Sequence, residues 1–458
     1  MHARLAAAAR ASRSDLPVLV SVSERLAGVH DPSALVFASR AGGEAWFCLE
    51  QPERDGMSLG ALGSAHELRA SGPGRFGEVG ALWRALAGRA RGDGGEGPAG
   101  AGLVAVGGFA FADEGGRSPA WAGFEPASMV VPRVSFARSG AETWITVNAA
   151  VAHGEDVEAV EVEVDGALAR LRERPLPLLD PAPTGQFEVH SALAPAHYEE
   201  AVAGAVARIR RGEAKKLVLA REVQVRAPSD HDPAAVFDVL RGGFPTCYVY
   251  AVGRGEATFI GATPELLVRR EGQRASTVAL AGSIRRSADP AVDDHLGESL
   301  LRSEKNREEN LIVAQRITSA LAPHALWVTV APEPVVVKVA NIQHLAVPIR
   351  AQLRSGAGEI ELAGLLHPTP AVGGDPDVVA QRLIPALEGM DRGWYAGTVG
   401  WSDAAGDGEF CVALRCALLR GRHASCFAGA GILADSDPAQ ELAETETKLQ
   451  ALLPILSG

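Results

Sequence analysis

A proline-rich stretch from residue 174 to 186 divides the chain into two parts. It has the sequence RPLPLLDPAPTGQ, with four prolines in thirteen residues. Because proline fixes φ and lacks an amide proton, such a stretch does not fit inside a helix or a central strand. Its composition is typical of an extended connector. We therefore predict an N-terminal region over residues 1–185 and a C-terminal region over residues 186–458.

The N-terminal region alternates strand-like runs with loops. The run LVAVGGFAFA at 103–112 predicts a strand with a glycine break, and apolar periodicity predicts helices near 76–90 and 155–174. Two stretches, GPGRFG at 72–77 and GDGGEG at 92–97, match G-x-G-x-x-G. We expect neither to follow a strand and open a helix, so no dinucleotide site is predicted.

Charge and cysteine usage exclude several classes of protein. The chain has 56 acidic and 44 basic side chains and no long Lys/Arg run, which argues against nucleic acid and anionic membrane surfaces as partners. No run of 18 apolar residues predicts a membrane span. The five cysteines form no C-x-x-C pair, which favours reduced thiols and a cytoplasmic location. An anionic small molecule stays possible, since a pocket's local field can oppose the net charge.

Two lysines precede an apolar run early in the C-terminal region. A helical pattern from Tyr198 to Ile209 leads into EAKKLVLAR at 213–221. Successive strand residues point to opposite faces, so Lys216 shares a face with Val218 and Ala220 while Lys215 lies on the other face. Lys216 is therefore predicted to point into the protein, where burying a lysine is costly and so indicates a function for its amine.

Two acidic helical patterns predict a metal site. Glu441, Glu444 and Lys448 share one stripe of the last helix, which by itself would fit a solvated face with a Glu444–Lys448 pair. Glu309 lies on an apolar stripe of an earlier helix, where a carboxylate needs a partner. Carboxylates from two helices that meet in a cleft would suit Mg²⁺. The lack of clustered His and Cys argues against zinc.

Further segments offer groups that bind anions or transfer protons. Arg415 is expected in a strand, CVALRC, from which its guanidinium can bind a carboxylate in a bidentate manner. GAGIL at 429–433 and LAGSIR at 280–285 offer bare backbone amides. Glu265 in GATPELL follows a proline turn. It is either a helix-start residue or the acid of an acid–base couple with Lys216.

Ten segments of the C-terminal region resemble the chorismate-utilising enzyme family. In chain order they are KLVLAR, GATPELL, LAGS, SEKNREENLIV, HLAVPI, HPTPAVGG, RGWYAGTVGW, ALRC, GAGILADSDP and ELAETETK. The resemblance implies an α/β (α+β) fold with two antiparallel sheets face to face and helices outside, in α-β-β-α layers. It also implies that residues 1–185 add strands and helices to this compound fold and that residues 186–458 form the chorismate-binding catalytic region.

The resemblance also implies roles for individual residues. Glu309 and Glu444 match ligands of Mg²⁺, with Glu441 beside them. The residues implied to contact the substrate chorismate are Arg415 and Tyr395 at the pyruvyl carboxylate, Lys448 near the ring carboxylate, Gly282, Ser283 and Gly429 as donors, and His344. From the sequence alone, a lone histidine on an apolar strand is more often a core residue.

Two positions indicate which member of the family the chain resembles. Members that use water carry lysine at the position of Lys216, where ammonia-using members carry glutamine. Water needs a base to become a nucleophile, and a desolvated lysine can serve as that base. Ala371 stands where members that expel pyruvate commonly carry threonine. Both positions favour an isochorismate synthase, with Lys216 as general base and Glu265 as general acid.

Three alternatives remain open. They are a salicylate synthase, an anthranilate or aminodeoxychorismate synthase component I with a glutaminase partner, and a non-catalytic chorismate-binding paralogue. We expect a monomer without a glutaminase subunit. One departure from the family pattern is Asn306 and Asn310 beside Glu309, where members often carry Asp and His; this puts metal affinity in question.

Overall fold

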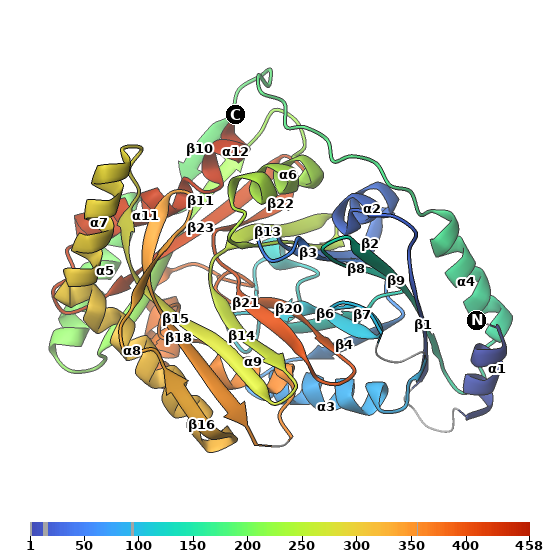
Figure 1. Ribbon diagram of the computed structural model, residues 1–458. Coiled ribbons are helices and arrows are strands. Elements are labelled where there is room, and N and C mark those ends of the chain that lie inside the picture. Colours follow the sequence, from blue (N-terminus) through green and yellow to red (C-terminus); the bar gives the residue numbers. More distant parts are fainter. Residues whose placement is uncertain (1, 12–16, 93–95, 355) are drawn as a thin grey trace.

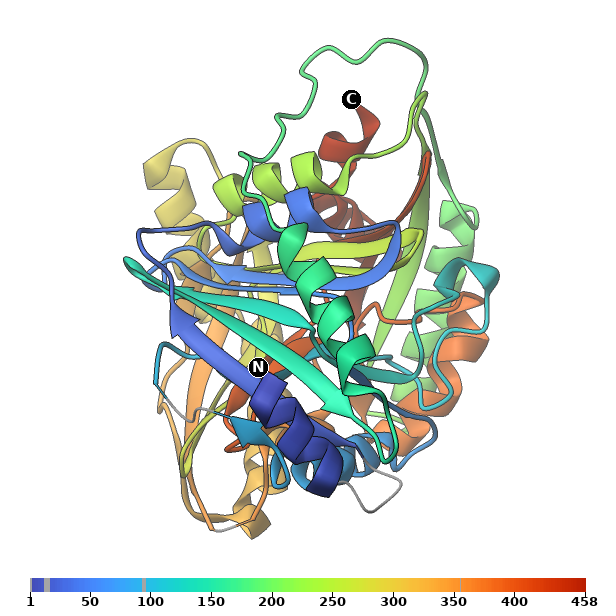
Figure 2. The same ribbon diagram turned by 90° about the vertical axis from the view of Figure 1, so that its right-hand side faces the viewer.

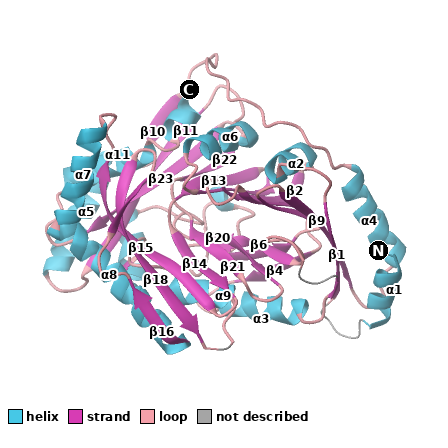
Figure 3. Ribbon diagram, viewed as in Figure 1, coloured by secondary structure: helices cyan, strands magenta, loops and turns pink. Residues whose placement is uncertain are grey.

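The computed structural model describes residues 2–11, 17–92, 96–354 and 356–458. Two large sheets lie face to face at its centre, and helices cover their outer sides (Figures 1 and 3). This arrangement confirms the predicted α-β-β-α layers. Among the described residues, every strand pair is antiparallel except the short pair β1–β5.

The larger sheet contains 13 strands within the described residues. In spatial order they are β10 (Glu188–Ser191), β11 (Lys216–Arg226), β23 (His423–Ile432), β22 (Cys416–Arg420), β13 (Ala257–Thr263), β12 (Tyr248–Gly255), β2 (Gly43–Gln51), β3 (Met57–Leu62), β8 (Val134–Ser139), β9 (Glu142–Val151), β1 (Val18–Arg25) and β5 (Arg91–Gly92), with β19 (Gly374–Asp375) paired to β11 off this path.

The smaller sheet contains ten strands within the same described ranges. In spatial order they are β16 (Ala325–Val330), β18 (Ile342–Leu353), β15 (Arg274–Arg285), β14 (Leu266–Glu271), β21 (Gly408–Val412), β20 (Thr398–Asp403), β6 (Val104–Phe109), β7 (Ala127–Val131) and β4 (His66–Ala70), with β17 (Val335–Lys338) paired to β18.

Helices pack on the outer faces and at one end of the two sheets. Those against the larger sheet are α1 (His2–Ala11), α2 (Pro32–Ser39), α4 (Val157–Ala169), α5 (Pro195–Arg210), α6 (Pro233–Gly243), α10 (Asp377–Glu388), α11 (Pro438–Leu449) and α12 (Leu453–Ser457). Those against the smaller sheet are α3 (Arg75–Ala87), α7 (Pro290–Arg302), α8 (Glu304–Leu321) and α9 (Glu359–Leu366). Figure 2 shows α1 and α4 side by side at one end. Among the described residues, no helix combines the length and the apolar character that a membrane crossing requires.

The proline-rich connector is an extended loop, and both sheets contain strands from either side of it. Residues 171–187 form no helix or strand and run over the outside of the molecule (Figure 1). β2, from the N-terminal region, pairs with β12, from the C-terminal region, in the larger sheet. β6 pairs with β20 in the smaller sheet in the same way. The two regions therefore share one hydrophobic core between the sheets.

The helices and the strand predicted for the N-terminal region are confirmed, one glycine pattern contradicts our expectation, and the other, GDGGEG, includes residues 93–95, which lie outside the described residues. α3 and α4 are the two expected helices, and β6 is the expected strand. GPGRFG lies between β4 and α3, so our expectation that no strand and helix flank it was wrong. β4 is an edge strand that pairs antiparallel with β7, which is not the parallel unit that binds dinucleotides.

Candidate active site

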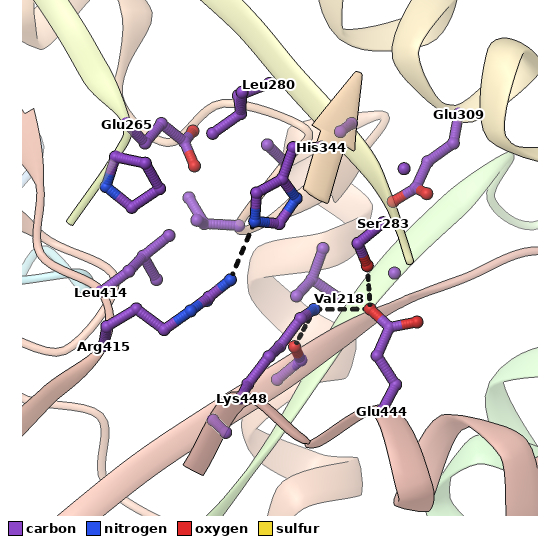
Figure 4. Close-up of a pocket in the computed structure, with 18 of the residues that line it drawn as sticks. Val218, Glu265, Leu280, Ser283, Glu309, His344, Leu414, Arg415, Glu444 and Lys448 are labelled. Carbon is purple, nitrogen blue, oxygen red and sulfur yellow. Dashed lines mark hydrogen bonds and ion pairs between the residues drawn. The ribbon is translucent and has the colours of Figure 1, made fainter. Parts of the chain in front are cut away.

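A cavity of about 60 Å³ lies where segments of both sheets meet α8 and α11 (Figure 4). Predicted site residues from the two sheets, two helices and several connecting segments line it. They are Glu265, Gly282, Ser283, Glu309, His344, Ala371, Tyr395, Arg415, Gly429, Glu444 and Lys448. The structure thus brings together eleven of the predicted side chains or backbone positions. Lys216 and Glu441 do not line the cavity but lie against residues that do, as described below.

Two crossings between the sheets place Glu265 and Arg415. The chain leaves the larger sheet at Thr263 and enters the smaller one at Leu266, so Glu265 lies on the crossing. It crosses back between Val412 and Cys416, and Arg415 lies there. The crossings are adjacent: the Val412 amide donates to the Glu265 carbonyl at 2.9 Å, and the Ala262 amide donates to the Arg415 carbonyl at 3.1 Å.

This geometry corrects two expectations. CVALRC is not one strand, because β21 ends at Val412 and β22 begins at Cys416. Arg415 has a φ of 48°, which no strand residue adopts. Glu265 begins no helix, because β14 follows it. The crossings carry both side chains into the space between the sheets, where the cavity lies.

Glu265 is held in a form that can donate a proton. Its side chain is buried at one side of the cavity (Figure 4). Burial raises the pKa of Glu265 to about 7, although the positive charges of Arg415, Lys216 and Lys448 act in the opposite direction. A substantial fraction of this carboxyl is therefore protonated near neutral pH.

Arg415 is a buried cation without a carboxylate partner. Its Nη2 lies 3.1 Å from His344 Nε2. Burial lowers the pKa of His344 well below its ordinary value, and the charges of Arg415 and Lys448 lower it further, so the imidazole is neutral and accepts this hydrogen bond. Among the described residues, no carboxylate oxygen lies within 4.0 Å of the Arg415 guanidinium. The geometry leaves this cation available to an anionic group in the cavity.

Lys216 lies at the Glu309 side of the site, away from Glu265 and Arg415. It is fully buried, and its Nζ lies 2.9 Å from Glu309 Oε1. Lys215, the residue before β11, is exposed and pairs with Asp375 at 3.3 Å, as the alternation predicted for the two lysines requires. Gly431, opposite Val218 in the strand pair, makes room for this contact, because a Cβ there would collide with Glu309 Oε1 and crowd Lys216 Cε.

Glu444 is the centre of a second charged group at this side. Lys448 Nζ lies 2.6 Å from Glu444 Oε1 and donates to the Gly429 carbonyl at 2.8 Å. Ser283 Oγ donates to the same Glu444 oxygen at 2.9 Å. Burial acts to raise the pKa of Glu444, but Lys448 and the Ser283 hydrogen bond outweigh it and lower the pKa. Glu444 is therefore a carboxylate at neutral pH.

The carboxylates of Glu309 and Glu444 fit a hard cation between them. Both line the cavity, and each holds a lysine ammonium group in the ion pairs described above. Glu441 is buried and pairs with Lys305 at 3.1 Å, away from the cavity lining. In the part of the chain that the structure describes, no three His, Cys, Asp or Glu side chains converge as a metal site. Mg²⁺ needs only one or two protein carboxylates beside substrate and water oxygens, so the donor set suits it.

Asn306 and Asn310 bind the backbone of β15, and Asn310 also binds that of β18. Asn310 Nδ2 is within 3.2 Å of the carbonyls of Ala279, Ala281 and Leu345. Asn306 Oδ1 accepts a hydrogen bond from the Ser283 amide at 3.2 Å. The two asparagines thus hold the β-bulge between Ala281 and Ser283, which turns Ser283 Oγ toward Glu444.

We expect Gly282→Ala to destabilise the fold more than Gly272→Ala does. Both glycines have positive φ, 79° and 59°, but only a Cβ at Gly282 would crowd Asn306, at 2.9 Å. Gly272→Ala should cost about 1–2 kcal/mol for its φ alone. Gly282→Ala should cost about 1–3 kcal/mol more through overpacking. Urea unfolding of both variants measures the difference, and equal losses would contradict this account of the bulge.

The remaining cavity wall includes residues that the sequence analysis missed. Gly431, the second glycine of the GAGIL segment, was noted for its backbone amide but given no role of its own; it lies two residues after Gly429 on β23 and also lines the cavity. Leu414 and Phe427 add apolar walls, and Tyr395 stacks on Phe427 at a ring distance of 5.2 Å. Ala371 lines the cavity from the loop that precedes β19. No pattern in the sequence distinguished Leu414 and Phe427 from ordinary core residues.

Comparison with known proteins identifies the family. A family model described as "chorismate binding enzyme" matches residues 5–457. The chain belongs to this chorismate-binding enzyme family. Among relatives of this family, the chain is 38% identical over 450 residues to the "salicylate biosynthesis isochorismate synthase" of Pseudomonas aeruginosa, which covers 98% of this chain and 92% of the relative. It is 36% identical over 357 residues to isochorismate synthase MenF of Bacillus subtilis, over 78% of this chain and 75% of the relative.

Solved structures of chorismate-binding enzymes share the fold. A putative 2,3-dihydroxybenzoate-specific isochorismate synthase, DhbC of Bacillus anthracis, superposes with a TM-score of 0.72 at 28% identity, covering 91% of this chain and 97% of that one. MenF of Escherichia coli superposes with a TM-score of 0.79 over 100% of both chains. Its 24% identity supports the fold alone.

Proposed function

We propose that the chain is a Mg²⁺-dependent isochorismate synthase. It converts chorismate to isochorismate by adding water at C2 of the ring and removing the hydroxyl at C4. In this proposal residues 186–458 form the catalytic region and residues 1–185 complete the fold. The enzyme would act as a cytoplasmic monomer without a glutaminase subunit. The two relatives described above, at 38% and 36% identity, carry the name isochorismate synthase, which supports this assignment.

The placement of Lys216 and Glu265 carries the proposal. Lys216 Nζ lies 2.9 Å from Glu309 Oε1. Glu309 and Glu265 lie on opposite sides of the cavity, with Glu265 near Arg415 (Figure 4). A base and an acid on opposite sides of a ring suit an addition at one carbon with departure from another. Lysine at this position, where ammonia-using members of the family carry glutamine, supports water as the nucleophile.

In this mechanism each residue has a defined task. Lys216 in its neutral form removes a proton from the attacking water, and protonated Glu265 donates a proton to the departing C4 hydroxyl. The free guanidinium of Arg415, hydrogen-bonded to neutral His344, binds the pyruvyl carboxylate. Lys448 contributes positive charge near the ring carboxylate, and buried apolar walls exclude bulk water from the ring.

Glu309 and Glu444 would hold Mg²⁺, with Glu441 beside them. When bound, the ion would supply charge stabilisation at the ring carboxylate. Lys216 and Lys448 neutralise these carboxylates in the structure described here, so both ion pairs would have to rearrange around a cation.

The test of the function is a product assay with purified protein and chorismate. We expect isochorismate to accumulate with Mg²⁺ and turnover to stop after EDTA treatment, and Mg²⁺ should restore it. Glu444→Gln should raise the Mg²⁺ concentration needed for half-maximal rate, because it removes one carboxylate charge. Accumulation of salicylate and pyruvate without a second enzyme would favour a salicylate synthase, and a product formed only with ammonia would favour an anthranilate-type enzyme. Either outcome would contradict the proposal.

A further inference from the structure

A buried ion pair, Glu388 with Arg392, lies beside β11 but outside the cavity lining. Glu388 is the last residue of α10, and Arg392 follows in the turn after it; they are 3% and 5% exposed. Arg392 Nε donates to Glu388 Oε2 at 3.0 Å, and Nη2 donates to Oε1, which makes a bidentate pair. Removing both charges from water costs free energy, so a buried pair of this kind suggests a structural role, which its other contacts can identify.

Those contacts go to the backbone of the two segments that wall the cavity. On β11, Glu388 Oε1 accepts from the Ala220 amide at 2.7 Å, and Arg392 Nη2 donates to the Val218 carbonyl at 2.9 Å. On the loop before β19, Arg392 Nη1 donates to the Val372 carbonyl at 2.8 Å. Val218 and Val372 both line the cavity. One guanidinium therefore ties the strand that carries Lys216 to the loop that carries Ala371.

The pair replaces a strand that is absent from this edge of β11. One edge of β11 pairs with β23 along most of its length. On the other edge, β19 pairs only with Lys216 and Leu217, and β10 pairs only from Val223 onward. Among the described residues, no strand pairs with the intervening stretch on this edge. The Val218 amide donates to the Gly373 carbonyl at 2.7 Å. Arg392 satisfies the Val218 carbonyl and Glu388 satisfies the Ala220 amide, which no strand of the described residues binds on this edge.

The pair also forms part of the wall between the cavity and a solvent groove. A groove of about 670 Å³ lies on the far side, lined by Glu388 and Arg392 among others. The Arg392 guanidinium packs over the Phe111 ring at 4.2 Å, and Phe111 lines the same groove. Removing either charged side chain would leave a gap between this groove and the backbone of β11.

We infer that Glu388 and Arg392 are positioning residues for Lys216. By fixing Val218 and Ala220 they set the path of β11, and this path places Lys216 Nζ against Glu309, whose side chain lines the cavity. Arg392 also holds the Val372 carbonyl, and so fixes the adjoining loop, whose Gly373 carbonyl accepts from the Val218 amide at 2.7 Å. The inference rests on the proposed role of Lys216 as the base. A misplacement of a catalytic group by about 1 Å can lower a rate about 10²-fold, so this pair should matter for turnover even though it touches no substrate.

The experiment compares Arg392→Met and Arg392→Lys with a control variant, Arg269→Met. Arg269 Nε also pairs with a buried glutamate, Glu409 Oε2, at 2.9 Å, but neither residue touches β11 or the cavity. Steady-state assays give kcat and KM for chorismate, and thermal unfolding gives the loss of stability. Hydrogen exchange measured by mass spectrometry reports the protection of the amides of residues 216–222.

We expect Arg392→Met to lower kcat about 10²-fold with little change in KM. Arg392→Lys keeps the charge opposite Glu388 but cannot reach both carbonyls, so it should recover part of the loss, and it tests the inference if the methionine variant fails to fold. Arg269→Met should destabilise the protein, while kcat per folded molecule stays within about twofold of the native value. This is expected for an ion pair that contacts neither β11 nor the cavity.

Exchange should accelerate at residues 216–222 in both Arg392 variants and not in Arg269→Met. Unchanged kcat in folded Arg392→Lys, or an equal loss of kcat in Arg269→Met, would overturn the inference. If the native protein does not convert chorismate, the proposed function fails. In that case the exchange data decide separately whether the pair holds β11: selective deprotection supports this role, and its absence overturns it.

Discussion

Replacing Lys216 with alanine should lower kcat about 10²–10⁴-fold, the range that a general base contributes. The substitution removes the amine that lies 2.9 Å from Glu309 at the cavity, while β11 keeps its backbone pairing to β23. KM for chorismate should change less, because Arg415 and Lys448, which we propose contact the carboxylates of the substrate, are unchanged. Steady-state kinetics with saturating Mg²⁺ measure both parameters.

The neighbouring residue provides a matched control. Lys215 has the same side chain and directly precedes Lys216 in the chain, but it is exposed and pairs with Asp375. Lys215→Ala should leave kcat within about twofold, since exposed ion pairs contribute about 0–1 kcal/mol. If Lys216→Ala retained full turnover while correctly folded, water activation by this lysine would be disproved whatever the product.

Glu265→Gln should lower kcat/KM about 10²–10⁴-fold and change its pH dependence. The carboxyl must be protonated to act as an acid, and burial raises the pKa of Glu265 to about 7. It is protonated below that value and ionised above it, so the kcat/KM of the native enzyme should fall as the pH rises through about 7. The glutamine variant cannot ionise at this position, so this decline should disappear from its residual activity.

A second buried carboxyl, Glu359, serves as the control for the pH dependence assigned to Glu265. Glu359 is fully buried in α9, and burial raises its pKa well above the ordinary value, but it does not line the cavity. Glu359→Gln should preserve the decline above neutral pH. A pH profile that loses its decline in Glu359→Gln, or keeps it unchanged in Glu265→Gln, would assign the titration to another group.

The resemblance to the chorismate-utilising enzyme family predicted the layers of the fold and most of the residues that meet at the cavity. Strand alternation distinguished buried Lys216 from exposed Lys215 because that signal depends only on local backbone geometry. The crossings at Glu265 and Arg415 were not predicted. CVALRC is apolar on both sides of the crossing, so its hydrophobic pattern resembles one continuous strand.

Contacts between side chains and the backbone of distant segments could not be predicted from the sequence. Asn306 and Asn310 were noted for the charges they lack, whereas in the structure they hold the bulge of β15. Glu388 and Arg392 were missed because their partners are main-chain groups of other segments. The partners on β11 lie more than 160 residues earlier in the chain, and the Val372 carbonyl lies 20 residues before Arg392. Such contacts leave no periodic pattern, since they depend on how the elements pack in three dimensions.

The continuous larger sheet has a consequence for how this protein can be divided. The proline-rich connector suggests a place to cut, yet β2 from before it hydrogen-bonds to β12 from after it. A fragment that began at residue 186 would expose the unpaired edge of β12 in the middle of what is now a sheet. Exposed edges of this kind promote association with other chains. We therefore expect that residues 186–458 do not fold as an independent module without the strands of the N-terminal region.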